Sequence, residues 1–184
     1  MRATFLIADY TIIIDDSKID YQSEKAQINA VKEDDEYTFD VISCAARPVE
    51  FSIVNQLSKL SKDEIREKCE IANQNKEMVV LSNNSNHLVL SPFVERFTYF
   101  GEEQAEVFTN EVIDICNSLN ASSLRITQFC MLRSDNMPVY PQFKGILNAL
   151  KNRENESTLK VVFFDVPHDH FYDLEILFGS FAQK

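Results

Sequence analysis

Glycine is scarce in this sequence, and its scarcity excludes several nucleotide-binding and catalytic motifs. The chain of 184 residues contains three glycines, Gly101, Gly145 and Gly179, and no two of them are close together. The P-loop, the dinucleotide-binding fingerprint and the GxSxG nucleophile elbow all need glycines where the backbone approaches a ligand or turns sharply. The sequence contains none of these three motifs, but their absence does not exclude catalysis.

Long apolar runs and closely spaced cysteines are also absent. No stretch approaches the roughly 18 apolar residues that span a bilayer, and the first apolar run is interrupted at Asp9, too early for a secretory signal. We therefore expect a cytoplasmic protein without membrane contact. The four cysteines, Cys44, Cys69, Cys116 and Cys130, lack metal-finger spacing, so we expect them to be small buried hydrophobic side chains.

Basic residues are too few to balance the acidic ones. The chain has 29 Asp and Glu against 18 Lys and Arg, which gives a formal net charge of −11. The imbalance is greatest in residues 1–40 and 101–120. Such a surface repels phosphate backbones, so no direct binding to nucleic acid is expected. The alternative is a solvated acidic face that only increases solubility.

The composition is typical of a globular protein. Hydrophobic residues make up 45% of the chain and include 14 Phe, whereas disordered chains are poor in apolar and aromatic residues. The length is sufficient for one core without a metal or a disulfide. We therefore predict a single α+β domain that spans residues 1–184.

Hydrophobic periodicity indicates several strands and helices. The predicted strands are residues 3–14, 19–31, 37–44, 78–81, 87–90, 93–99, 124–133 and 158–165. The predicted helices are residues 48–60, 62–75, 102–119 and 139–150, with residues 171–181 as a last strand or short helix. Because no regular βαβ repeat is visible, we predict an α+β fold. Its mainly antiparallel sheet would have about six to eight strands, with three to four helices packed against it.

One polar segment near the C-terminus is a candidate metal site. In an extended segment, His168 and His170 would project to the same face, and Asp173 or Glu175 could complete an open site for a divalent cation. Such a metal would be the only cofactor that the sequence suggests. The alternative is a solvated polar turn after a core strand, because paired histidines without a defined third ligand are common.

Three other groups of residues have weaker chemical interpretations. Cys130 and His168 could meet if their strands are neighbours, as nucleophile and base. Arg125 and Arg133 could bind a carboxylate or phosphate, or could pack their stems over the sheet with their charged groups in water. The adjacent carboxylates Asp15 and Asp16 are interpreted as a solvated turn in which both ionise freely.

These observations favour a non-enzymatic interaction or regulatory protein. It would use an acidic face or a sheet edge to bind another protein, most simply as a homo-oligomer. One alternative is a metal-dependent hydrolase that uses the His168 and His170 cluster. Another is an acidic inhibitor that imitates the charge of nucleic acid.

Overall fold

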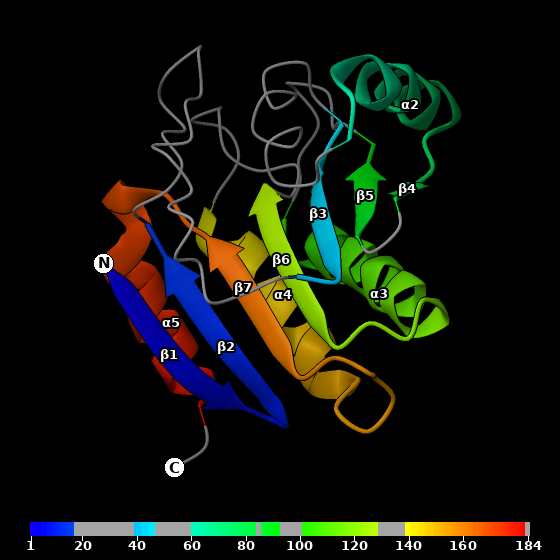
Figure 1. Cartoon of the computed structure of the whole chain (residues 1–184). Helices are drawn as coiled ribbons and strands as arrows, with labels where there is room; N and C mark the ends of the chain where they lie inside the picture. Colours follow the sequence, from blue (N-terminus) through cyan, green and yellow to red (C-terminus); the bar gives the residue numbers. More distant parts are fainter. Residues whose placement is uncertain (17–38, 47–59, 84–85, 93–100, 129–138, 183–184) are drawn as a thin grey trace.

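Seven strands form one mixed β-sheet at the centre of the molecule (Figure 1). The computed structural model describes residues 1–16, 39–46, 60–83, 86–92, 101–128 and 139–182. The strands are β1 (Arg2–Ile7), β2 (Tyr10–Asp15), β3 (Val41–Ala45), β4 (Val79–Ser82), β5 (His87–Ser91), β6 (Ser123–Gln128) and β7 (Val161–Asp165). Their order across the sheet is β1-β2-β7-β6-β3-β5-β4.

The five central strands, β2, β7, β6, β3 and β5, run parallel to one another. Only the edge strands β1 and β4 are antiparallel to their neighbours. The prediction of a mainly antiparallel sheet is therefore wrong, although the predicted number of strands is confirmed. Neighbouring parallel strands need a crossover connection, which is usually a helix. The predicted helices at residues 102–119 and 139–150 provide such crossovers.

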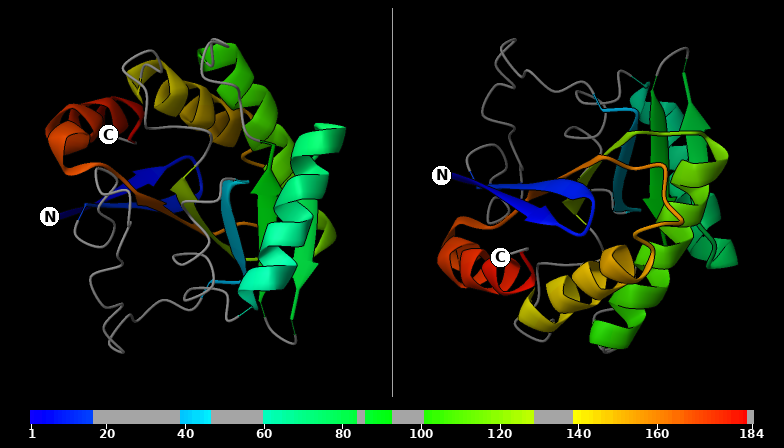
Figure 2. Two further views of the ribbon diagram at one scale, coloured as in Figure 1. Left: turned by 90° about the horizontal axis from the view of Figure 1, so that it is seen from above. Right: turned by 90° about the horizontal axis from the view of Figure 1, so that it is seen from below.

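Helices cover both faces of this sheet (Figure 2). They are α2 (Lys62–Asn75), α3 (Glu102–Ser118), α4 (Val139–Asn152) and α5 (Phe171–Phe181), with a short 3₁₀ helix, η2 (His168–His170), before α5. Side chains of α3, α4 and α5 share the larger hydrophobic core with one sheet face. Side chains of α2 contribute to a second core on the other face. The predicted number of helices agrees with the four α-helices described.

Several local predictions are confirmed. Helix α2 begins after Ser61, whose hydroxyl accepts a hydrogen bond from the Glu64 amide at 3.2 Å, as an N-cap does. Strands β4 and β5 form the predicted hairpin. Cys44, Cys69 and Cys116 are buried and form no disulfide among the described residues. The predicted elements at residues 19–31, 48–60 and 93–99 lie largely or wholly outside the described residues, as does Cys130.

The predicted strand at residues 3–14 is a hairpin of β1 and β2. Ile7 pairs with Tyr10, so Ala8 and Asp9 form a two-residue turn. Ala8 has a φ of 49°, although such turns usually have glycine, asparagine or aspartate at positions of positive φ. The prediction of one strand is wrong because the turn has alanine, and not glycine or asparagine, at its position of positive φ.

In the part of the chain that the structure describes, no helix combines the length and the apolar character that crossing a membrane requires.

A row of charged side chains crosses four strands on the α2 face of the sheet. Asp15 and Asp165 are register partners on β2 and β7, and each is 3% exposed. Arg125 on β6 donates two hydrogen bonds to Asp165, at 2.7 and 2.8 Å, and Arg2 on β1 donates one to Asp15 at 2.8 Å. Two buried carboxylates on adjacent strands would repel each other, so the two guanidinium groups stabilise this arrangement.

The ring of Phe163 lies beneath both guanidinium groups. The central carbon of the Arg125 guanidinium is 5.0 Å from the centre of this ring, and that of Arg2 is 5.5 Å away. Arg125 is only 3% exposed, so its charge is balanced inside the protein by Asp165 and the ring. This arrangement fixes the end of β7 relative to β6.

Helices α3 and α4 touch at Gly145. A Cβ atom built on Gly145 would lie 2.2 Å from the carbonyl oxygen of Glu102 and 3.1 Å from the Cβ of Ala105. Asn148 adds a hydrogen bond to the Glu102 carboxylate at 2.9 Å. Glycine is therefore required at this position by the close approach of the two helices.

Replacing Arg125 by Met should destabilise the protein by about 3–5 kcal/mol, because Asp165 would remain buried without the guanidinium that balances its charge. The free energy of unfolding in urea measures this. The matched control is Arg66→Met in a solvent-exposed pair with Asp63, with an expected change below about 0.5 kcal/mol. Equal effects of the two changes would contradict the structural importance of the buried pair.

Gly145→Ala should also destabilise the protein, by about 1–3 kcal/mol, because its methyl group would collide with the backbone of α3. The control is Gly179→Ala on α5, where a Cβ atom would meet only a Phe5 ring carbon, at 3.8 Å. That change should be neutral or stabilise by up to about 1 kcal/mol, as alanine usually does within helices. Thermal unfolding of both variants measures this difference in stability. Equal stability of the two variants would contradict the backbone contact between the helices.

Candidate functional site

The carboxyl ends of the five parallel strands meet at one edge of the sheet, here called the carboxyl edge. The chain that leaves β3 continues to α2, β4 and β5 on one side, whereas the chain that leaves β6 returns through α4 to β7 on the other. The connections therefore diverge between β3 and β6. In open α/β sheets, ligands bind in the crevice outside the strand ends at such a switch point. The topology indicates this edge as the candidate site.

Asp16 and His168 form a hydrogen-bonded pair at the carboxyl edge. Asp16 directly follows β2, and its side chain is 3% exposed, whereas that of His168 is 74% exposed. The Asp16 Oδ2 atom is 2.7 Å from Nδ1 of His168, and Oδ1 contacts the N-terminal ammonium of Met1. A buried carboxylate thus orients a solvent-facing imidazole.

The environment of Asp16 determines its protonation. Burial would raise the pKa of its carboxyl group, but hydrogen bonds and charge interactions with the N-terminal ammonium and His168 outweigh burial and lower the pKa. An ionised carboxylate only accepts hydrogen bonds, so Nδ1 of His168 is the donor. In a neutral imidazole this leaves Nε2 as an acceptor. The pair can therefore offer a ring nitrogen of His168 to a ligand, whereas both Asp16 oxygens are already engaged.

The interpretation of Asp15 and Asp16 as a solvated turn is wrong. Asp15 is buried in an ion pair with Arg2, and the Asp16 side chain is nearly buried beside His168. A signal is present in the sequence, because the apolar strands YTIIID and VVFFD both end in an aspartate. In a parallel pair, these two endings lie side by side.

The structure separates the three predicted metal ligands. His168 contacts Asp16, whereas His170 and Asp173 line a cavity between α4 and α5. The segment is not extended, because it forms the 3₁₀ helix η2 followed by α5, so the histidines do not project as alternate residues of a strand. Within the described ranges, no group of three or more His, Cys, Asp or Glu could hold a metal ion. The metal site stays a prediction.

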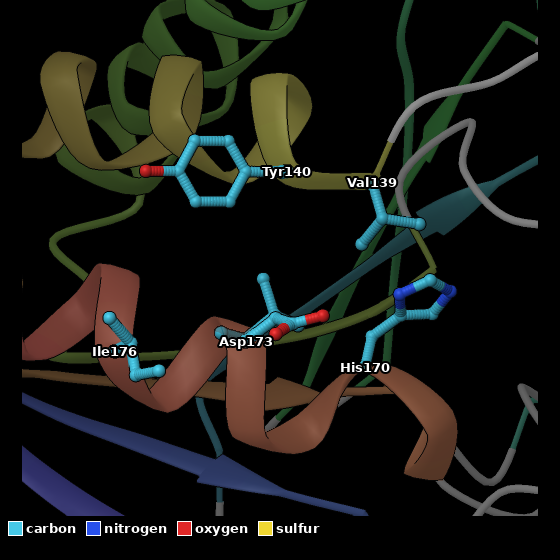
Figure 3. A pocket seen from close by; sticks show the side chains of 6 residues that line it. Val139, Tyr140, His170, Asp173 and Ile176 are labelled. Atoms are coloured by element: carbon cyan, nitrogen blue, oxygen red, sulfur yellow. The ribbon is translucent and has the colours of Figure 1, made fainter.

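The cavity between α4 and α5 has a volume of about 200 Å³ (Figure 3). Its lining residues come from the first turn of α4 and from the segment around the start of α5: Val139, Tyr140, His170, Asp173, Leu174 and Ile176. The Tyr140 side chain lies on the α4 side, and Asp173 faces it from α5. The cavity therefore combines apolar walls with three polar groups.

The other sequence candidates are placed as follows. Arg125 is buried and forms an ion pair with Asp165, so its guanidinium does not face solvent, where an external anion could bind it. Arg133 and Cys130 lie outside the described residues. Their predicted roles stay predictions.

The fold resembles that of macrodomains. The Oceanobacillus iheyensis macrodomain with ADP superimposes with a TM-score of 0.65 at 14% sequence identity, over 98% of each chain. The Trypanosoma brucei macrodomain in complex with ADP-ribose gives 0.57 at 14% identity, over 76% of this chain and 63% of that one. The macrodomain of Thermus aquaticus DarG gives 0.53 at 12% identity, over 72% and 92%.

Sequence comparison does not extend this likeness. No protein-family model matches the chain, and no curated protein matches it. The structural comparisons therefore establish a macrodomain fold, whose described residues form a seven-stranded mixed sheet and four α-helices.

These comparisons contradict the function expected from the sequence. Similar structures were solved with ADP and with ADP-ribose, which are nucleotide-derived ligands. The prediction of a non-enzymatic interaction or regulatory protein, which would bind another protein through an acidic face or sheet edge as a homo-oligomer, is therefore wrong. So is the expectation that its partner is another protein, with no direct nucleic acid, because the similar structures hold nucleotide-derived ligands. Net charge misled the interpretation, because it describes the whole surface and not the local charge at one edge of the sheet.

Proposed function

We propose that this protein binds an ADP-containing ligand, ADP or ADP-ribose, at the carboxyl edge of its sheet. The observation that carries the proposal is the likeness over 98% of the chain to a macrodomain solved with ADP. It is supported by the divergence of chain connections between β3 and β6, where α/β sheets commonly bind nucleotides.

Helix amino ends can offset the charge of the diphosphate. Helices α3, α4 and α5 follow β5, β6 and β7, so they begin on the side of the carboxyl edge (Figure 1). The amino end of a helix carries about half a positive charge and offers unpaired N–H groups. This local field favours a diphosphate most at α4, whose first turn has no acidic residue, because Glu102 and Glu103 on α3 and Asp173 on α5 offset the field at the other two amino ends.

The Asp16 and His168 pair supplies polar contacts beside these helix ends. In dinucleotide sites, an acidic side chain beyond a strand commonly accepts hydrogen bonds from ribose hydroxyls. Here the acidic side chain, Asp16, is buried and both of its oxygens are engaged, so the solvent-exposed His168 that it orients would make the contact to the ligand. We therefore assign the pair to the ribose or base portion of the ligand.

ADP and ADP-ribose should each stabilise the folded protein. At a ligand concentration of about 100 times Kd, the stabilisation is about 2.7 kcal/mol. For a domain of this size, that raises the Tm by about 5 to 10 °C. Thermal unfolding and calorimetric titration measure the effect. Absence of any shift or binding heat with both ligands would refute the proposal.

Variants locate the binding site. His168→Ala and Asp16→Asn should weaken ADP binding by about tenfold, the effect of losing one charge-assisted hydrogen bond. The matched control is His87→Ala, because His87 begins β5 at the opposite edge of the sheet and contacts Ser82. If His87→Ala weakens binding as much as His168→Ala, the assignment to the carboxyl edge fails.

A further inference from the structure

We infer that His168 determines which base the proposed nucleotide site accepts. It selects a purine that carries an exocyclic amino group over a purine that carries a carbonyl oxygen at the same position. The inference rests on the proposed function, because it concerns the ligand of that same site. Its basis is the hydrogen bond from His168 to Asp16, which decides which ring nitrogen carries a proton.

Asp16 fixes the tautomer of the His168 ring. The ionised carboxylate can only accept hydrogen bonds, and its Oδ2 atom is 2.7 Å from Nδ1 of the ring, so Nδ1 carries the proton. The Asp16 side chain is 3% exposed, and its Oδ1 atom contacts the Met1 ammonium, so both oxygens are held in place. In the neutral ring, the other nitrogen, Nε2, then has a lone pair and no proton.

The pair therefore presents one hydrogen-bond acceptor to a ligand and no donor. The His168 side chain is 74% exposed, and no side chain of the described residues bonds its Nε2 atom. A ligand group that donates a hydrogen bond satisfies this nitrogen. A ligand oxygen at the same place would bring two lone pairs together and leave both atoms unpaired and shielded from water, which costs binding free energy.

The position of the pair along the carboxyl edge favours a contact with the base. Asp16 follows β2 and His168 follows β7, whereas α4, whose amino end suits the diphosphate, follows β6. Neighbouring strands are about 4.8 Å apart, so β2 lies roughly 10 Å from β6. The ribose of ADP is joined directly to the diphosphate, so its hydroxyl groups stay near it. The amino group of the adenine is the donor furthest from the diphosphate.

The other side of α4 suits a sugar. Figure 2 shows α4 between α3 and α5, and the first turn of α3 contains Glu102 and Glu103. Acidic side chains of this kind commonly accept hydrogen bonds from ribose hydroxyls. The second ribose of ADP-ribose therefore fits on the α3 side, and the adenine extends toward β7 and β2, where His168 lies.

ADP and inosine diphosphate (IDP) test this selection, because IDP has a carbonyl oxygen in place of the amino group of ADP. Calorimetric titration of the full chain at about pH 8, where histidine is neutral, should show that IDP binds at least about fivefold more weakly than ADP. Equal affinities overturn this inference and leave the proposed function intact. Absence of binding by both nucleotides overturns both.

Variants of His168 separate base selection from a structural role. His168→Ala should weaken ADP binding about tenfold and leave IDP binding unchanged, so that the preference for ADP is lost. His168→Gln should retain ADP binding and strengthen IDP binding, because its amide can turn to offer either an oxygen or an NH₂ group. The matched control is His170→Ala, an exposed histidine of the same 3₁₀ helix, which should keep the wild-type preference.

A contact with a ribose hydroxyl would give a different pattern. In that case 2′-deoxy-ADP or 3′-deoxy-ADP would bind more weakly than ADP to the wild-type protein but not to His168→Ala, and IDP would bind as well as ADP. This pattern overturns the inference, and so does a preference for ADP over IDP that persists in His168→Ala. Thermal unfolding checks that every variant is folded.

Discussion

The four parallel pairings at the centre of the sheet require that both of its faces be covered. Strands such as β7, with the sequence VVFFD, place apolar side chains on both faces of the sheet. Both faces must therefore be shielded from water. Helices α3, α4 and α5 therefore pack on one face and α2 on the other. The same pairing brings the strand carboxyl ends together at one edge. The location of the candidate site is a consequence of how the core is built.

The charged row across β1, β2, β7 and β6 lies near this edge. Asp15 and Asp165 would be costly in isolation, and they are tolerated because each is paired with an arginine. Asp16, one residue beyond the pair, turns to His168 instead. Consecutive aspartates therefore have different roles. Asp15 balances the charge of Arg2 within the sheet, whereas Asp16 orients the imidazole of His168, which is exposed to solvent.

Local features were predictable from the sequence, whereas long-range pairings were not. The Ser61 cap and the apolar repeat of α3 depend on residues within a few positions of each other, so the pattern identified them. The parallel pairing of β2 with β7 joins residues about 150 positions apart and leaves no local signature. The burial of Asp15 and Asp16 depends on that pairing, and so does the proximity of His168. The metal-site hypothesis assumed an extended backbone where the chain instead coils into η2.

The missing side chain of Gly145 has a consequence for binding. It lets the middle of α4 approach the backbone of α3 at the first residue of that helix, Glu102, so the axis of α4 is held in a fixed position relative to the amino end of α3. Their conformational entropy is lost when the chain folds. A ligand bound as proposed at the carboxyl edge would meet dipoles that are already oriented, so its affinity would not be reduced by the need to order them.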